Sequence, residues 1–129
     1  MQVSTIREAI GMVDALKPNR VPSAEKLKWL SQCDSAIFND IVMTHEHAEG
    51  MPAHFEGYGP DTDLDTVLLA RPPHDELYRH YLEMQIDLVN MEMAKYNNAS
   101  ALYNSAYQSY AAWYNRKHKP VSAVTHFKL

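Results

Sequence analysis

The chain is poor in cysteine: Cys33 is the only one in 129 residues. A single thiol excludes a disulfide within the chain and leaves too few thiolates for a zinc-thiolate site. No apolar run approaches the roughly 20 residues that a membrane-spanning helix needs. The first residues also lack the continuous apolar segment of a secretory signal. These absences favour a protein that is made in the cytosol and has no membrane partner.

Basic residues are absent from the middle of the chain. Residues 29–70 contain no Lys or Arg, although they carry eight of the acidic residues, and the formal net charge of the whole chain is −4. Contacts with phosphate require cations. The acidic middle therefore argues against a nucleic-acid-binding surface in this part of the protein.

Residues 96–115 contain no charged side chain at all. Five of these twenty residues are Tyr, five are Ala, one is Trp, and most of the others are Asn or Ser. No Gly or Pro interrupts the run, so it is compatible with a helix. A solvated helix normally carries charge on its outer face. We therefore expect protein to cover most of this helix, and part of that protein to come from another subunit.

The remaining pattern predicts a single, mainly α domain spanning residues 1–129, because this length suits one domain and a hydrophobic fraction of 46% can build a core. Thr5 and Glu8 fit a capping box at the start of a helix, Ser23 is a candidate N-cap, and Asn97-Asn98 suggests a turn. Apolar residues recur at helical spacing between these signals. The predicted helices span about 5–17, 23–46, 75–96 and 98–118, and a tail follows at 120–129.

A segment rich in Gly and Pro separates the second and third helices. Residues 54–58 and 66–70 have the composition of short strands, with turn-forming residues at 59–63 between them. We expect a small β-hairpin or extended arm over residues 47–73. An isolated hairpin is marginally stable in water, so this arm should pack on the helices or on a neighbouring chain.

Two clusters resemble metal sites only in part. His45-Glu46-His47, with His54 nearby, offers zinc ligands, but the spacing of two residues places them on different sides of a helix. The acidic run at 61–65 copies the first ligands of a calcium loop, but Thr66 and Pro72 occupy the positions that require Gly and Glu. An exposed helix end and a solvated turn explain these runs better. No nucleophile motif or phosphate-binding loop is present, and Cys33 falls on a predicted buried face. We therefore expect neither an enzyme nor a cofactor.

Four tyrosines in the uncharged run recur on one helical face. These subunit-interface candidates are Tyr103, Tyr107, Tyr110 and Tyr114. Leu102, Ala106 and Trp113 lie on an adjacent face and are the predicted core contacts. Tyr and Trp are enriched at protein interfaces, which favours a tyrosine face that meets another subunit. Half-exposed tyrosines are the simpler alternative. Stacking on nucleic-acid bases is a weaker one, because no Lys or Arg lies between the aromatic residues.

Particular residue runs also resemble a known family. They are Ile86-Asp87, KYNN at 95–98, AYQ at 106–108 and WYNR at 113–116, together with the segments at 4–19 and 55–77. With residues 78–120 as a whole, they resemble the small head–tail connector (adaptor, head-completion or neck) proteins of tailed bacteriophages and prophages. The resemblance covers most of the chain and carries no active-site motif.

The resemblance implies a structural virion protein at the head–tail neck, assembled in the bacterial cytoplasm. Its subunits form a ring, commonly of twelve copies, that docks under the portal protein, extends the DNA channel and receives the next neck or tail protein. Packaged DNA would pass through without specific binding. The tail would dock on the portal, with Val121, Val124 and Phe127 as candidates.

Two other functions are open on sequence grounds. One is a small helical DNA-binding or regulatory protein of a phage or mobile element. A recognition helix presents cations and amides to base edges, whereas the last predicted helix has Asn and Gln but no cation between Lys95 and Arg116. The other is a small metal-dependent enzyme that uses the residues from His45 to His54.

Overall fold

The computed structural model of the protein describes residues 4–45 and 51–118. These residues form four α-helices and one π-helical turn, and they contain no strand. The elements are α1 (Ile6–Leu16), α2 (Ser23–Ile37), the π-helical turn η1 (Phe38–Val42), α3 (Glu76–Val89) and α4 (Met93–Lys117). The predicted mainly α, four-helix fold is confirmed. Within the described residues, none of the helices is both long and apolar enough to cross a bilayer.

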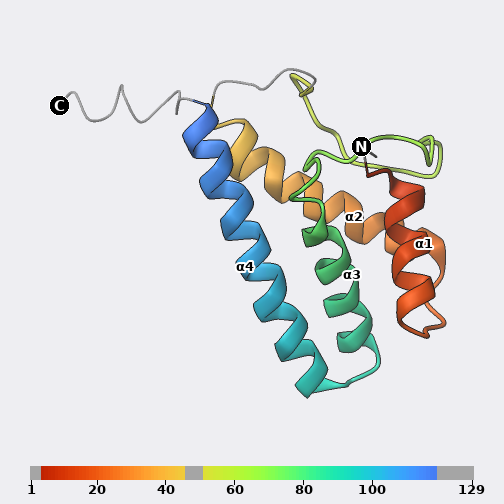
Figure 1. Cartoon of the computed structure of the whole chain (residues 1–129). Helices are drawn as coiled ribbons and strands as arrows, with labels where there is room; N and C mark the ends of the chain where they lie inside the picture. The colour runs from red at the N-terminus through yellow and green to blue at the C-terminus, as the bar shows by residue number, and fades with distance from the viewer. Residues whose placement is uncertain (1–3, 46–50, 119–129) are drawn as a thin grey trace.

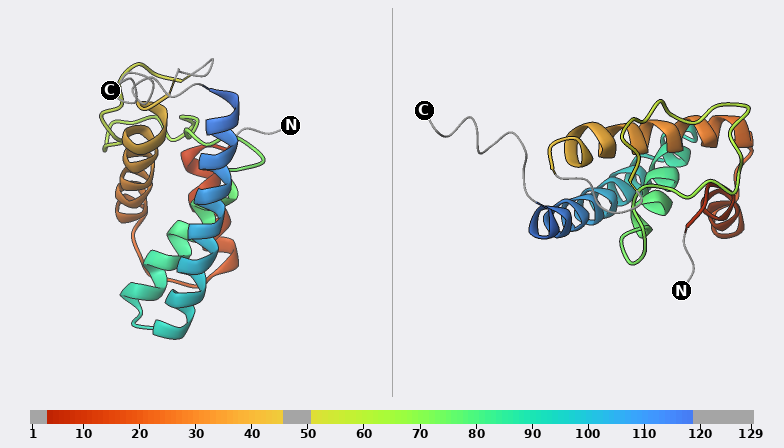
Figure 2. Two further views of the ribbon diagram at one scale, coloured as in Figure 1. Left: turned by 90° about the vertical axis from the view of Figure 1, so that its left-hand side faces the viewer. Right: turned by 90° about the horizontal axis from the view of Figure 1, so that it is seen from above.

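The helices lie in a fixed order across the molecule. Figure 1 shows α3 and α4 side by side and antiparallel, with α2 crossing behind them and α1 on the side of α3 away from α4. The two views in Figure 2 show the same order. In the part of the chain described, α1 packs on α2 and α3 but does not contact α4. α1 and α4 are therefore the two flanks of the subunit.

The first helix begins at the predicted capping box. The Glu8 amide donates to Thr5 Oγ1 at 3.1 Å, and the Thr5 amide donates to Glu8 Oε1 at 3.0 Å. The next orphan donors of the helix are also satisfied, because the amides of Ile6 and Arg7 donate to carbonyls of the 51–75 loop. α1 is thus tied to this loop at its first turn.

The predicted β-hairpin is not formed in residues 51–73. Its second candidate strand pairs instead with the chain that leads into α1: Thr5 and Val67 form an isolated antiparallel bridge, and the Leu68 amide donates to the Ser4 carbonyl at 3.0 Å. The described residues 54–58 and 66–70 share no backbone hydrogen bond. The segment is a loop that lies over one end of the helices (Figure 1).

The predicted boundaries of the second helix need two corrections. Ser23 is the first helical residue and not the cap, since Pro22 occupies the N-cap position and no side chain caps the helix. At its far end α2 widens into η1, where the Met43 amide donates to the Phe38 carbonyl at 2.9 Å. The regular helix therefore ends before the predicted limit, and residue 46 lies outside the described residues.

The break between the last two helices also differs from the prediction. α3 ends at Val89, and the chain reverses through Met91, which has a φ of 57°. Asn97-Asn98 does not form a turn but lies inside α4. Helices commonly end with Gly or Asn in this left-handed conformation. A methionine there gives no sequence signal, so the break was placed too late in the chain.

The core lies between α2, α3 and the inner face of α4, and α1 covers its far side. Its largest fully buried side chains include Leu30, Ile37, Leu77, Leu82 and Ile86. Cys33 is buried among them as a free thiol, as predicted from its place on α2.

Candidate functional site

The four interface-candidate tyrosines of α4 point toward the body of the subunit. Tyr110 and Tyr114 are only 1% and 0% exposed, and Tyr103 and Tyr107 are half-buried against the core. The prediction that this row faces another subunit is therefore wrong for Tyr110 and Tyr114. An aromatic ring buries far more apolar area than Ala, so the helix packs its tyrosine row inward.

One of the predicted core residues of α4 is wrongly assigned: Leu102 is 45% exposed. Ala106 and Trp113 are partly buried and pack against the core, as predicted. The side of α4 that faces the core therefore holds residues of both predicted faces, which lie about 100° apart around the helix.

The tyrosine hydroxyls differ in their partners. Tyr103 Oη lies 3.9 Å from Cys33 Sγ, and Tyr107 Oη donates to Asp40 Oδ2 at 3.5 Å. Burial and the nearby Asp40 carboxylate raise the pKa of Tyr107 to about 12. The Tyr110 hydroxyl is buried and has no hydrogen-bond partner among the described residues. Tyr107 therefore stays protonated at neutral pH, and the rings of all four tyrosines pack in or against the core.

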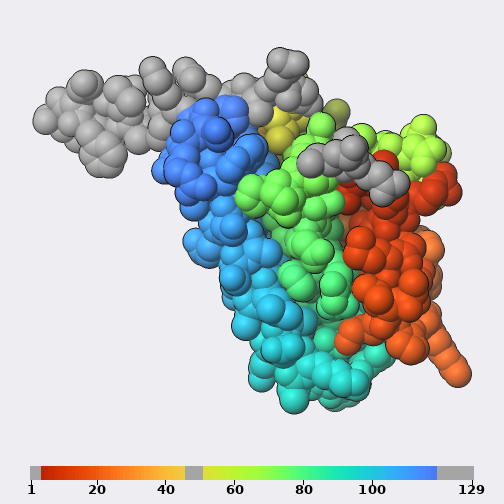
Figure 3. All heavy atoms as spheres, in the orientation of Figure 1, coloured from red at the N-terminus to blue at the C-terminus, as the bar shows by residue number. Residues whose placement is uncertain are grey.

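The outward face of α4 is the unusual surface of the subunit. Seven of the exposed residues of α4 recur at alternating spacings of four and three, the spacing of a seam between two helices. They are Ala94, Asn98, Ala101, Ser105, Gln108, Ala112 and Asn115. None is charged, and all are small or carry an amide. We call this set the outer α4 seam. Figure 3 shows that α4 forms one continuous flank of the molecule.

A buried carboxylate holds the 51–75 loop on the helices. Asp34 of α2 is fully buried; its Oδ1 accepts from the Tyr78 hydroxyl at 2.6 Å, and its Oδ2 accepts from the Tyr58 hydroxyl and from the Leu69 amide at 3.1 Å. The Tyr78 hydroxyl in turn accepts from the Ala70 amide at 2.7 Å. The carboxylate therefore joins α2, α3 and two points of the loop.

Burial raises the pKa of Asp34 to about 6, although the hydrogen bonds from Tyr58, Tyr78 and the Leu69 amide pull it back toward its ordinary value. A shifted pKa of this kind can mark an active site. Here the carboxylate is enclosed on every side, so it has no access to a substrate. Its arrangement supports an anchoring role. Sequence reasoning missed this cluster, because its members are far apart in the chain and Asp34 has no recognisable motif.

The candidate metal residues do not converge. His45 Nδ1 lies 2.7 Å from the Ile41 carbonyl, its Nε2 lies 3.0 Å from Asn115 Oδ1, and Asp65 pairs with Arg7 at 3.0 Å. No group of three His, Cys, Asp or Glu side chains in the described ranges is arranged to hold a metal ion. Glu46 and His47 lie outside those ranges, as do the tail candidates Val121, Val124 and Phe127.

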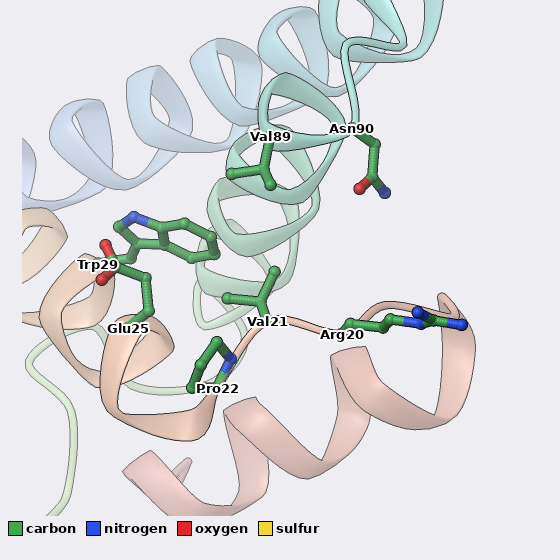
Figure 4. A pocket seen from close by; sticks show the side chains of 7 residues that line it. All are labelled: Arg20, Val21, Pro22, Glu25, Trp29, Val89 and Asn90. Atoms are coloured by element: carbon green, nitrogen blue, oxygen red, sulfur yellow. The ribbon is translucent and has the colours of Figure 1, made fainter.

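Two hollows lie beside the start of α2. One, of about 310 Å³, lies beside Trp29, where Val21 and Val89 approach from the α1–α2 link and from α3 and Arg20 extends along the rim (Figure 4). The other is an apolar groove of about 530 Å³ between α1, the start of α2 and the loop. Both are open surface features, and neither contains a set of convergent catalytic groups.

Comparisons with known proteins identify no relative. No family model matches the chain, and neither the curated proteins nor the solved structures contain a significant match.

Proposed function

We propose that this chain is a structural subunit of a head–tail connector ring of a tailed bacteriophage or prophage. In this role it docks under the portal, extends the DNA channel and joins the head to the next neck or tail component. The resemblance of its residue runs to connector proteins suggests the role. The observation that carries it is the outer α4 seam.

The outer α4 seam suits a protein contact better than it suits solvent. A contact on a charged surface would remove charges from water, which costs free energy unless they are paired. Between Asn98 and Asn115 the seam has no charge to desolvate, and its Ala and Ser side chains let a second helix approach closely. An exposed helix that serves no contact normally alternates Lys and Glu. The seam is therefore the surface that we assign to assembly.

A DNA-binding role has weaker support. The exposed amides of α4 would need neighbouring cations to hold the phosphate backbone. Lys95 is paired with Glu92 at 2.8 Å, and the next cation along the helix is Arg116 in its last turn. A helix of this kind lacks the electrostatic attraction that brings a protein to DNA.

Deleting the gene for this protein from the phage that encodes it tests the proposed function. We expect lysates without it to contain DNA-filled heads and separate tails by electron microscopy, and the purified protein to restore joined particles in the extract. Ser105→Glu, which places a charge in the outer α4 seam, should fail to restore them. Leu88→Glu changes an exposed residue of α3 outside the seam and should restore them. Joined, infectious particles in the complete absence of the protein would refute the proposal.

A further inference from the structure

We propose that the apolar groove between α1 and α2 receives the outer α4 seam of the next copy of this chain. This inference rests on the ring function proposed above and adds the second half of the contact between subunits. Four observations carry it: the lining of the groove, the backbone exposed at Gly11, the neutrality of the seam, and the positions of the two surfaces on the subunit.

The groove is lined by apolar and small side chains from three segments. α1 contributes Ile10 and Gly11, α2 contributes Ala24 and Leu27, and the loop contributes Pro60 and Leu64. Leu64 is 38% exposed, so apolar area remains open to water. The one charged residue of the lining, Arg7, is already paired with Asp65 at 3.0 Å. A neutral surface can therefore enter the groove without burying an unpaired charge.

Gly11 opens the wall of this groove to a close approach. It lies inside α1, where Gly is less favourable than Ala because of its greater backbone freedom. A Cβ added at Gly11 would have no heavy atom within 4 Å. The packing of the subunit itself therefore does not require glycine here. Because Gly11 has no side chain, the backbone of α1 at this position is accessible to a neighbouring helix.

The outer α4 seam has the matching properties. It is neutral, so it can enter the groove without burying an unpaired charge, and the small side chains of Ala101 and Ala112 let a neighbouring helix approach closely. Leu102, at its edge and 45% exposed, supplies an apolar side chain for the groove. The groove and the seam are therefore compatible in charge and in side-chain size.

The two surfaces lie on opposite flanks of the subunit. α1 and α4 are separated by α3 and make no contact with each other within the described residues, and Figure 3 shows them as the two edges of the molecule. When a subunit contacts its neighbour through two different surfaces, the same contact repeats from copy to copy. The copies form a closed ring when the rotation that relates each copy to the next divides a full turn evenly. A contact of one seam with another seam would give a two-fold pair and leave the groove uncovered. The head-to-tail arrangement covers both surfaces.

Cysteine cross-linking tests this pairing directly. The native Cys33 is 1% exposed, and burial raises the pKa of its thiol well above its usual range, so it should not react. Ala24→Cys places a thiol in the groove, while Ala101→Cys and Ala112→Cys place thiols on the seam. Each variant is mixed with the portal protein and treated with a short bis-maleimide, alone and together with a variant of the other surface.

We expect cross-links when a groove variant is mixed with a seam variant, and none from either variant alone or from the unmodified protein. A chain with one cysteine on each surface should give a ladder of oligomers. Self-cross-linking of Ala101→Cys or Ala112→Cys would show a seam-to-seam contact and overturn the inference. Unmodified protein that assembles on the portal while the mixed variants give no cross-link would also overturn it, although the ring function would stand. Protein that never assembles would refute the ring function itself.

Introducing a charge at the edge of the seam gives a second, independent test of the contact. Leu102→Glu should abolish assembly on the portal, while its circular dichroism spectrum stays that of the folded subunit. Leu88→Glu is the matched control, because Leu88 is equally exposed at 45% but lies on α3 outside both surfaces. The control should assemble normally. Equal assembly of the two variants would contradict the proposed contact.

Discussion

The buried carboxylate of Asp34 should make the stability of the protein depend on pH in an unusual direction. Its folded-state pKa of about 6 lies above the ordinary value of 3.8, because burial disfavours the charged form. Between these values the folded state binds the proton more tightly than the unfolded state does. The contribution of Asp34 to the free energy of unfolding therefore rises as the pH falls through 6 and is complete below 3.8.

The size of this effect follows from the two pKa values. The full difference corresponds to about 3 kcal/mol, at about 1.36 kcal/mol for each pKa unit. Proton linkage gives about 1.3 kcal/mol more stability from this group at about pH 5 than at about pH 7. Asp34→Asn removes the titration but leaves one acceptor oxygen where the carboxylate has two, so it loses a hydrogen bond from Tyr58 or Tyr78. That loss lowers the stability of the variant by a similar amount at every pH. The stability of the wild type relative to this variant should therefore increase by about 1.3 kcal/mol over that range.

Urea denaturation followed by tryptophan fluorescence measures the two free energies at each pH. Comparing the wild type with the variant cancels the other groups that titrate over this range. A difference that stays constant, or that decreases as the pH falls, would refute the assigned role of Asp34. Tyr58→Phe gives a second measurement. Without this hydroxyl donor to the carboxylate, the variant should lose more stability at neutral pH than at about pH 5.

Three further changes have defined outcomes in the same assay. Gly11→Ala should raise the free energy of unfolding by about 0.5–1 kcal/mol, because the added Cβ meets open space and Ala favours the helix; a loss of stability would contradict this. Lys17→Ala should lower the free energy of unfolding by about 3 kcal/mol at neutral pH, because it removes the Lys17 Nζ that lies 2.5 Å from the buried Asp87 carboxylate. Adding Asp87→Leu to this variant removes the unpaired buried charge and should recover much of that stability. Tyr110→Phe should leave stability unchanged or raise it by up to about 1 kcal/mol, because the hydroxyl has no partner among the described residues; a clear destabilisation would show that a partner exists.

The sequence predicts the helices well where the signals are local. The capping box of Thr5 and Glu8 is a contact between residues three apart, so it can be recognised without knowing the fold. The burial of Cys33 follows from helical spacing in the same way. The helix break at Met91 has no such signal, because its left-handed conformation depends on how α3 and α4 pack.

Features that depend on distant partners were not predictable from the sequence. Val67 pairs with Thr5, and no local signal indicates this contact between distant residues. The Asp34 anchor likewise requires residues 24 to 44 positions away to meet it. The uncharged run of α4 was recognised as a feature that needs protein cover, but its orientation was not. Spacing gave two adjacent faces, and only packing shows that Tyr110 and Tyr114 turn inward and the residues of the outer α4 seam outward.

We propose that this chain assembles head to tail into a ring on the portal. Native mass spectrometry of the purified protein, alone and mixed with the portal protein of the same phage, counts the copies that bind. We expect portal complexes that carry one defined number of copies, consistent with a closed ring, whether or not the isolated protein is a monomer. A protein that stays monomeric and leaves the mass of the portal unchanged would contradict the account.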